Sequence, residues 1–188
     1  MEQQGGVEDV RTLIAYYSRR GENLVGGAVQ NLQAGNTELL AAILQKLTGA
    51  DCFRIEPVKD YSENYYRCID QARQDLQRKY RPMLKQYPDH FDDYDVIYLG
   101  YPNYWGTMPM PVYSFLEQLD FAGKLIKPFC THEGGGMGRS EQDIRMICPK
   151  ARITDGLPIR GSEMKYELSA IEDWVYDSEK TIYAHQNL

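Results

Sequence analysis

The chain has 188 residues, of which 43% are hydrophobic and 12% aromatic, and this size and composition predict one globular domain with a hydrophobic core. Its formal net charge of −6 argues against proteins that need a cationic surface, such as those that bind nucleic acid or anionic membranes. No apolar stretch approaches the ~20 residues of a membrane span, and the polar, acidic residues 1–10 predict that there is no signal peptide.

Five apolar runs, which we predict to be strands, alternate with segments of helical periodicity. The expected strands are residues 12–17, 52–56, 96–100, 128–131 and 151–153, the last of them weak. The run at 96–100 is apolar throughout, which is typical of a strand covered on both faces. The alternation predicts an α/β fold with a mostly parallel sheet, in a single domain over residues 1–188 with its core at about 11–176.

The helices are predicted from apolar residues that recur every three or four positions. After Thr37, which we expect to cap the first helix, this pattern continues to Gly49, where the helix should end. Similar stripes occupy residues 65–80, 112–119 and 168–175. A further helix is expected to begin at Ser140, because Ser140 and Asp143 resemble a capping box.

The segment between the second and third strands, residues 57–94, is longer than a crossover connection requires. It holds six tyrosines, whose rings combine an apolar body with a polar tip. The segment is therefore either a helix with a long surface connection or a lid near a binding site.

Three loops that could carry a binding site follow strands at the same end of the predicted sheet. The first begins at Ser18 and leads to Gly35–Glu38, where backbone amides of a starting helix and nearby hydroxyl groups could form an anion site. The alternative is an ordinary helix cap at Asn36 and Thr37. The loop matches neither a Walker motif nor a dinucleotide-binding fingerprint, because it contains neither GxxxxGK[ST] nor GxGxxG.

The second and third loops add aromatic rings and glycines. Residues 101–109 carry Tyr104 and Trp105, which are either core residues or a platform for a flat ligand. Residues 131–138 have four glycines in five positions, and form either a flexible turn or a backbone that approaches a ligand closely. Together, the three loops predict an anion seat, an aromatic wall and a loop of exposed amides around one site.

The four cysteines, at positions 52, 68, 130 and 148, are too far apart for a CxxC motif or a zinc ribbon. We expect reduced, structural thiols in a cytoplasmic protein. No spacing of metal ligands is present, so no metal site is predicted. His132 has either a loop-orienting role or a role in proton transfer.

Three motifs of this chain resemble those of the flavodoxin-like FMN-binding family, and of its subgroup with an extended first loop. They are Leu13–Ser18 leading to Gly35–Thr37, then Pro102–Pro109, and then Thr131–Gly138. The resemblance implies an α/β three-layer sandwich with a five-stranded parallel sheet in the order 2-1-3-4-5. It also implies that FMN binds at the carboxyl ends of the strands, where the strand order reverses.

The resemblance further assigns residues to parts of the cofactor. The residues implied are Ser18, Asn36 and Thr37 for the phosphate, Pro102, Asn103, Tyr104, Trp105 and Gly106 for the isoalloxazine ring, and Thr131, Glu133, Gly134 and Gly136 for its other edge. The chain departs from the family by an insertion at residues 22–34, which we expect to bulge outward. Beside it, Arg20 either touches the phosphate or a second ligand, or faces solvent.

The resemblance implies that the flavin performs the redox chemistry and that no side chain acts as a nucleophile. We expect an FMN-binding redox protein that transfers electrons to or from partner proteins. The alternative is an FMN-dependent NAD(P)H oxidoreductase that acts on a quinone or a similar small acceptor. A third hypothesis is a flavin-free α/β protein whose anion seat binds another ligand. The sequence leaves the oligomeric state open.

Overall fold

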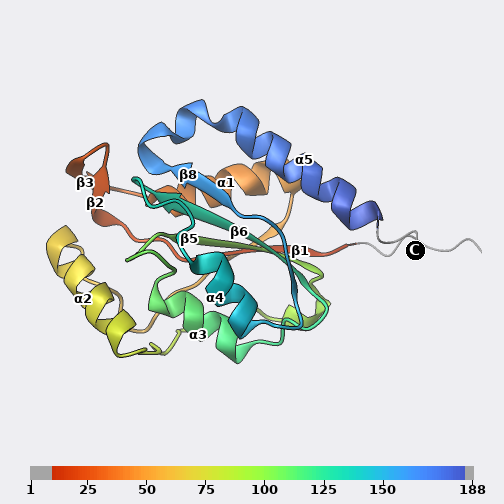
Figure 1. Ribbon diagram of the computed structural model, residues 1–188, viewed down its shortest axis with the longest axis horizontal. Helices are drawn as coiled ribbons and strands as arrows, with labels where there is room; N and C mark the ends of the chain where they lie inside the picture. Colours follow the sequence, from red (N-terminus) through yellow and green to blue (C-terminus); the bar gives the residue numbers. More distant parts are fainter. Residues whose placement is uncertain (1–9, 185–188) are drawn as a thin grey trace, which may run out of the picture.

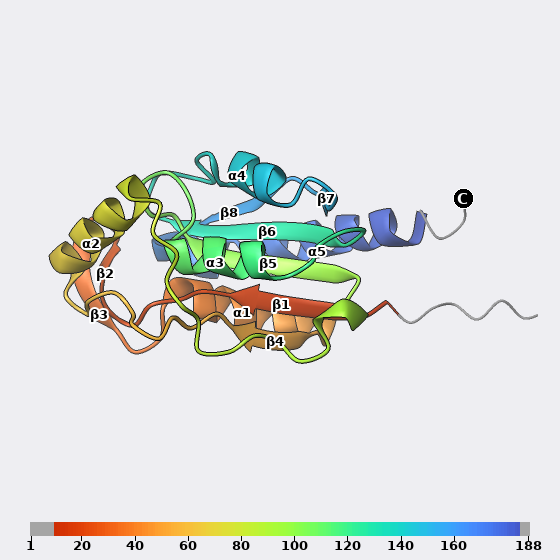
Figure 2. The same ribbon diagram turned by 90° about the horizontal axis from the view of Figure 1, so that it is seen from below.

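The computed structural model describes residues 10–184, with side chains described as far as residue 177. Its elements are β1 (Thr12–Tyr16), β2 (Gly21–Val25), β3 (Ala28–Leu32), α1 (Asn36–Thr48), β4 (Asp51–Arg54), α2 (Tyr65–Gln77), η1 (Phe91–Asp93), β5 (Val96–Pro102), α3 (Met110–Gln118), β6 (Leu125–His132), α4 (Ser140–Ile147), β7 (Arg152–Ile153), β8 (Leu157–Arg160), η2 (Gly161–Tyr166) and α5 (Leu168–Ala184). Three layers are visible in Figures 1 and 2: a central sheet, α1 and α5 on one face, and α3 and α4 on the other.

The central sheet is parallel, with its strands in the order β4-β1-β5-β6-β7, and β8 also pairs with β6. This confirms the expected α/β class with helices on both faces. The sheet differs in detail from the expected five strands, because two short strands, β7 and β8, pair with successive parts of β6. The weak run at 151–153 becomes β7, whereas β8 was not predicted, since Pro158 and Arg160 interrupt its apolar pattern.

The middle of the sheet explains why β5 is so apolar. Its residues from Val96 to Tyr101 are all buried, between the helices of the two faces. Gly100 is paired with Phe129 of β6, and a Cβ atom at position 100 would lie 2.1 Å from the Phe129 ring. Glycine is therefore required there for space, and Phe129 packs across the sheet where β5 reaches its carboxyl end.

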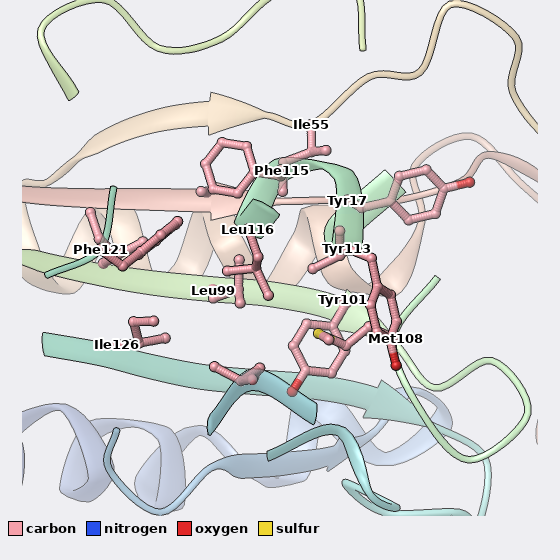
Figure 3. Close-up of a cluster of buried hydrophobic side chains, with 14 of the residues drawn as sticks. Tyr17, Ile55, Leu99, Tyr101, Met108, Tyr113, Phe115, Leu116, Phe121 and Ile126 are labelled. Carbon is pink, nitrogen blue, oxygen red and sulfur yellow. The ribbon is translucent and has the colours of Figure 1, made fainter. Parts of the chain in front are cut away.

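Two hydrophobic clusters fill the space between the layers. The cluster beneath α3 is drawn in Figure 3 and is rich in aromatic rings, among them Phe115 stacked on Phe53 and edge-on to Phe121. The cluster on the other face joins α1 and α5 through Leu40, Leu44 and Ile171. Since β1 and β5 lie between these two clusters, the carboxyl ends of both strands are held in fixed positions.

The caps of two helices differ from those predicted. Gly35, and not Thr37, is the N-cap of α1, and Thr37 lies inside the first turn. The capping box at Ser140 was also wrong: Arg139 is the N-cap of α4, and the Ser140 hydroxyl donates to the backbone oxygen of Met137 at 2.6 Å. The Thr37 hydroxyl pairs with that of Thr131, and the Ser140 hydroxyl accepts a hydrogen bond from the Tyr101 hydroxyl at 2.9 Å. These tertiary contacts override the local preference for a cap.

The insertion at residues 22–34 and helix α2 both lie at the carboxyl end of the sheet, whereas the rest of residues 57–94 runs back to η1 at the opposite end (Figures 1 and 2). The insertion, which was expected to bulge outward, forms the antiparallel hairpin β2–β3. The Glu22 carboxylate on β2 accepts hydrogen bonds from the Asn64 side chain at 2.7 Å and from the Tyr65 backbone amide at 2.9 Å. These bonds attach the hairpin to the start of α2, the helix formed within residues 57–94.

Three further features concern the cysteines, helices that could cross a membrane, and groups of metal-binding side chains. All four cysteines are free, and Cys52 is exposed whereas the other three are buried. None of the helices within residues 10–184 is both long and apolar enough to cross a membrane. In the same part of the chain, no three side chains of the metal-binding types gather into a group.

Candidate functional site

A cavity of about 470 Å³ lies at the carboxyl ends of β1, β5 and β6, and β2 and α2 provide its outer walls. It is lined by Ser18, Arg19, Asn23, Leu24, Gly35, Asn36, Thr37, Tyr65, Ile69, Ala72, Pro102, Asn103, Tyr104, Trp105, Thr131, His132, Glu133, Gly134 and Gly135. Its volume falls within the range of about 300–1,000 Å³ that is common for small-molecule sites. The site lies at the β1–β5 boundary, where the strand order reverses, as the topology of such sheets predicts.

The three loops predicted from the sequence therefore meet at one cavity. All of the predicted site residues line it except Arg20, Gly106 and Gly136. Arg20 is exposed, does not line the cavity and forms an ion pair with Glu38 at 2.9 Å. Gly106 and Gly136 instead hydrogen-bond through their backbones to the Asn103 side chain. The role of the lining residues in binding FMN remains a prediction.

The anion seat is formed where the loop after β1 meets the first turn of α1. The Ser18 hydroxyl accepts a hydrogen bond from the backbone amide of Glu38 at 3.1 Å. A Cβ atom on Gly35 would lie 2.3 Å from this hydroxyl oxygen, so only glycine allows the two segments to approach. Asn36 and Thr37 follow in the first turn, whose amides have no acceptor within the helix and can therefore bind an anion.

A buried pair of hydroxyl groups connects this seat to the third loop. The Thr37 and Thr131 Oγ1 atoms lie 2.7 Å apart, and both residues are buried. Thr37 belongs to α1 and Thr131 to β6, so one hydrogen bond fixes the helix start relative to the strand end. A ligand that contacts both residues would meet hydroxyl groups that are already positioned.

Tyr104 lies beneath the cavity in a cluster of aromatic and polar groups. Its ring meets the rings of Tyr17 and Tyr61, with centroids 6.5 and 6.0 Å away. Its hydroxyl accepts a hydrogen bond from Nε of Arg19 at 3.3 Å and a weaker one from Sγ of Cys68 at 3.7 Å. Burial, reinforced by Cys68, raises the pKa of this hydroxyl well above its usual value, so Tyr104 remains a neutral phenol.

Trp105 and Gly106 form a tight turn that projects the indole ring toward α2. Both residues have positive φ angles, 57° and 79°, and the turn is closed by backbone hydrogen bonds between Tyr104 and Thr107. This geometry corresponds to a type I′ turn, in which a bulky residue costs about 1–3 kcal/mol of strain. Trp105 is 48% exposed, which excludes the alternative that it is a core residue.

Asn103 holds the second and third loops together. Its Nδ2 donates to the backbone oxygen of Gly136 at 2.8 Å, and its Oδ1 accepts from the backbone amide of Gly106 at 2.9 Å. A Cβ atom on Gly135 would lie 2.9 Å from the Asn103 amide nitrogen. The glycines of the third loop therefore permit a close approach between two loops, and the loop is not merely a flexible turn.

His132 and Glu133 shape the third loop by accepting hydrogen bonds from backbone amides. Nδ1 of His132 accepts a hydrogen bond from the Gly134 amide at 2.9 Å, and burial together with Arg160 lowers the pKa of the imidazole. The Glu133 carboxylate accepts from the backbone amides of Gly26 and Ser162 at 3.0 and 2.8 Å. Glu133 thus joins the hairpin turn to η2, whereas the hydrogen bond of His132 is to the backbone of its own loop.

Several lining residues had not been assigned to a part of the cofactor, although Gly35, His132 and Gly135 lie within the predicted loops. The unassigned residues are Arg19, Asn23, Leu24, Gly35, Tyr65, Ile69, Ala72, His132 and Gly135. The residues from α2 belong to the stripe at 65–80 that predicted this helix, and helical periodicity does not reveal whether such a stripe faces a core or a cavity. Nothing in the sequence indicates that Arg19 turns inward while its neighbour Arg20 turns outward.

The chemistry of the cavity fits FMN. One end offers hydroxyl groups and helix-start amides to a phosphate, around a Gly35 position that is closed to any side chain. The other end offers the rings of Tyr104 and Trp105, which suit the face of a flat heterocycle. Of the residues that the sequence resemblance implies for FMN, all except Gly106 and Gly136 line this cavity.

Comparisons with known proteins point the same way. The sequence model of the family described as flavodoxin matches residues 28–178. Among solved structures, a protein of Bacteroides uniformis ATCC 8492 has a TM-score of 0.70 with 23% identity, over 89% of this chain and 98% of that one. A flavoprotein from Lactobacillus acidophilus NCFM, solved in complex with FMN, has a TM-score of 0.61 with 19% identity, over 84% and 98%. No curated protein matches this chain.

Proposed function

The chain belongs to the flavodoxin family, and on this basis we propose that it binds FMN in the cavity at the strand ends and transfers electrons through it. One observation carries this proposal: a single cavity joins the first turn of α1 to the Tyr104–Trp105 turn. A binding site for FMN needs an anion seat and an aromatic wall in the same pocket. Bound FMN would accept and donate one or two electrons.

The residues of the chain would bind and orient the cofactor. The first-turn amides at Asn36 and Thr37, with the Ser18 hydroxyl, would hold the phosphate. Tyr104 and Trp105 would flank the ring and exclude water from one of its sides. The contacts made by Asn103 keep the two loops at the ring edge in register, so little reorganisation is needed on binding.

We further propose that the protein is an electron carrier that exchanges electrons with partner proteins. The buried, neutral Tyr104 and the loop-orienting hydrogen bond of His132 support this proposal. The free cysteines fit the reducing conditions of the cytoplasm, where we propose that the carrier acts.

One feature favours a second candidate, an NAD(P)H oxidoreductase that reduces a quinone or a similar small acceptor. Leu24 of the hairpin and Tyr65, Ile69 and Ala72 of α2 add outer walls to the cavity. Walls of this kind would enclose a small acceptor beside the flavin ring, whereas a carrier that meets proteins needs an open ring edge.

The two candidates differ in turnover by the purified, FMN-loaded protein alone. Steady oxidation of NADPH in the presence of a quinone, above the rate with free FMN, would establish the reductase and reject the carrier. No turnover alone, together with turnover when a flavodoxin reductase is added, would establish the carrier. A protein that remains colourless after FMN is added would reject both.

A further inference from the structure

Arg19 is a buried cation beneath the candidate flavin site. Only 5% of its surface is exposed, although it immediately precedes the exposed Arg20. Its guanidinium donates to the backbone oxygens of Arg20, Ser62 and Glu63 at 2.9–3.2 Å, and also to that of Glu22. Burying an arginine in this way costs free energy unless opposite charge or strong hydrogen bonds compensate for the lost water.

No carboxylate compensates this charge within the part of the chain that the structure describes. The described part of the chain forms eleven ion pairs, and none of them involves Arg19. Its partners are backbone carbonyl oxygens and the Tyr104 hydroxyl, all of them neutral. Arg19 therefore retains a full positive charge in a poorly hydrated place.

Arg19 lies on the ring side of the cavity. Its Nε contacts the Tyr104 hydroxyl at 3.3 Å, and both residues line the cavity. The anion seat at Asn36 and Thr37 has its own donors, the amides of the α1 start. The positive charge of Arg19 is thus beside the aromatic wall. Water would screen little of its effect on a flavin ring bound there.

We propose that Arg19 is a positioning residue whose buried charge favours the reduced form of bound flavin over the oxidised form, so that it raises the midpoint potential. The inference rests on the proposed function. On full reduction near neutral pH the flavin ring takes up two electrons and one proton from its donor and solvent, and gains one negative charge. A cation that is already fixed nearby stabilises that charge, and it does so without reorganisation of the site.

The test is the midpoint potential of bound FMN in the wild type and in four variants, measured against a reference dye. Arg19→Gln and Arg19→Met remove the charge, Arg19→Lys keeps it, and Arg20→Gln is the matched control for an exposed neighbouring arginine. We expect the neutral variants to bind reduced FMN at least tenfold less tightly relative to oxidised FMN, a fall of about 30 mV for a two-electron couple. Arg19→Lys should lie closer to the wild type than to Arg19→Gln, and Arg20→Gln should match the wild type.

Three results would overturn the inference while leaving the proposed function intact. The first is a neutral variant that binds FMN with an unchanged potential. The second is Arg19→Lys shifting as far as Arg19→Gln, since the hydrogen bonds would then matter and not the charge. The third is folded neutral variants, by circular dichroism, that no longer bind oxidised FMN, because Arg19 would then serve both redox forms. Failure of the wild type to bind FMN would instead reject the proposed function itself.

Discussion

The indole nitrogen of Trp105 donates a hydrogen bond of 2.8 Å to the backbone oxygen of Ile69. This bond connects the loop after β5 to the middle of α2, and the Arg73 guanidinium lies 5.6 Å from the centre of the indole ring. The exposed wall of the cavity and the helix that covers it are therefore one connected unit. Trp105 holds this position with a positive φ angle, which a side chain of its size rarely adopts.

The backbone strain at Trp105 predicts that a glycine variant at this position is more stable than an alanine variant. Trp105→Gly and Trp105→Ala lose the same ring contacts, but glycine tolerates a positive φ angle and alanine does not. We expect Trp105→Gly to be the more stable of the two by about 1 kcal/mol in urea unfolding. Equal stability, or a more stable alanine variant, would show that the turn carries no strain.

Removing the indole ring of Trp105 should also weaken FMN binding. Stacking of a base on an aromatic side chain is worth about 1–3 kcal/mol, so Trp105→Ala should raise the dissociation constant by roughly 5- to 150-fold. Fluorescence titration measures this constant directly. Trp105→Phe, which keeps a ring but lacks the N–H group, should lose less. An unchanged constant in Trp105→Ala would remove this residue from the binding wall.

The Thr37–Thr131 pair predicts a loss specific to the phosphate. Thr37→Val keeps the shape of the side chain but removes the hydroxyl that meets Thr131 at 2.7 Å. FMN binding should weaken more than riboflavin binding, because only FMN carries a phosphate. Thr154→Val, a change at a partly exposed threonine outside the cavity, is the control and should affect neither ligand. A loss of equal size for both ligands would contradict a part for the Thr37 hydroxyl in the anion seat.

Asn103 should contribute to stability as well as to the site. Asn103→Ala removes two hydrogen bonds, to the backbones of Gly106 and Gly136, at a cost of about 1–3 kcal/mol in unfolding free energy. Asn103→Asp keeps the acceptor for Gly106 but places a carboxylate against the Gly136 oxygen, so we expect it to be no more stable than the alanine variant. A fully stable Asn103→Asp would show that the two loops are not joined by this side chain.

The stability of the protein at high pH should depend on Tyr113. Burial, together with its hydrogen bond to Asp143, raises the pKa of this hydroxyl to about 12, from the value of about 10 in an unfolded chain. The folded state therefore holds the proton more tightly, and this contribution to stability is complete below pH ~10 and is lost as the pH rises toward about 12. The unfolding free energy of the wild type should fall more steeply over this interval than that of Tyr113→Phe. Parallel curves would contradict the assignment.

Much of the fold could be predicted because its signals are local. The periodicity of Leu40, Leu44 and their neighbours identified α1, and the continuous apolar run at 96–100 identified the central strand β5. β8 escaped prediction because Leu157 and Ile159 alternate with exposed residues over only four positions. The caps at Thr37 and Ser140 were wrong because both hydroxyl groups have partners that lie far away in the sequence or outside the helix.

Those parts of the site that lie within the three sequence motifs were predicted. The loops at Ser18, Trp105 and Glu133 could be placed together, because parallel strands bring their carboxyl ends to one edge. The wall from α2 could not, since a bond such as that between Trp105 and Ile69 depends on the path of residues 57–94, which no periodicity specifies. The same holds for Arg19, whose partners come from the hairpin and from residues 62–63.

The central claim is that one cavity joins a phosphate seat to an aromatic wall and binds FMN, and titration of the purified apoprotein with FMN tests it most directly. Absorbance and fluorescence should show one FMN bound per chain, with riboflavin bound more weakly because it lacks the phosphate. FMN fluorescence and absorbance that remain those of the free cofactor at every protein concentration would contradict the account.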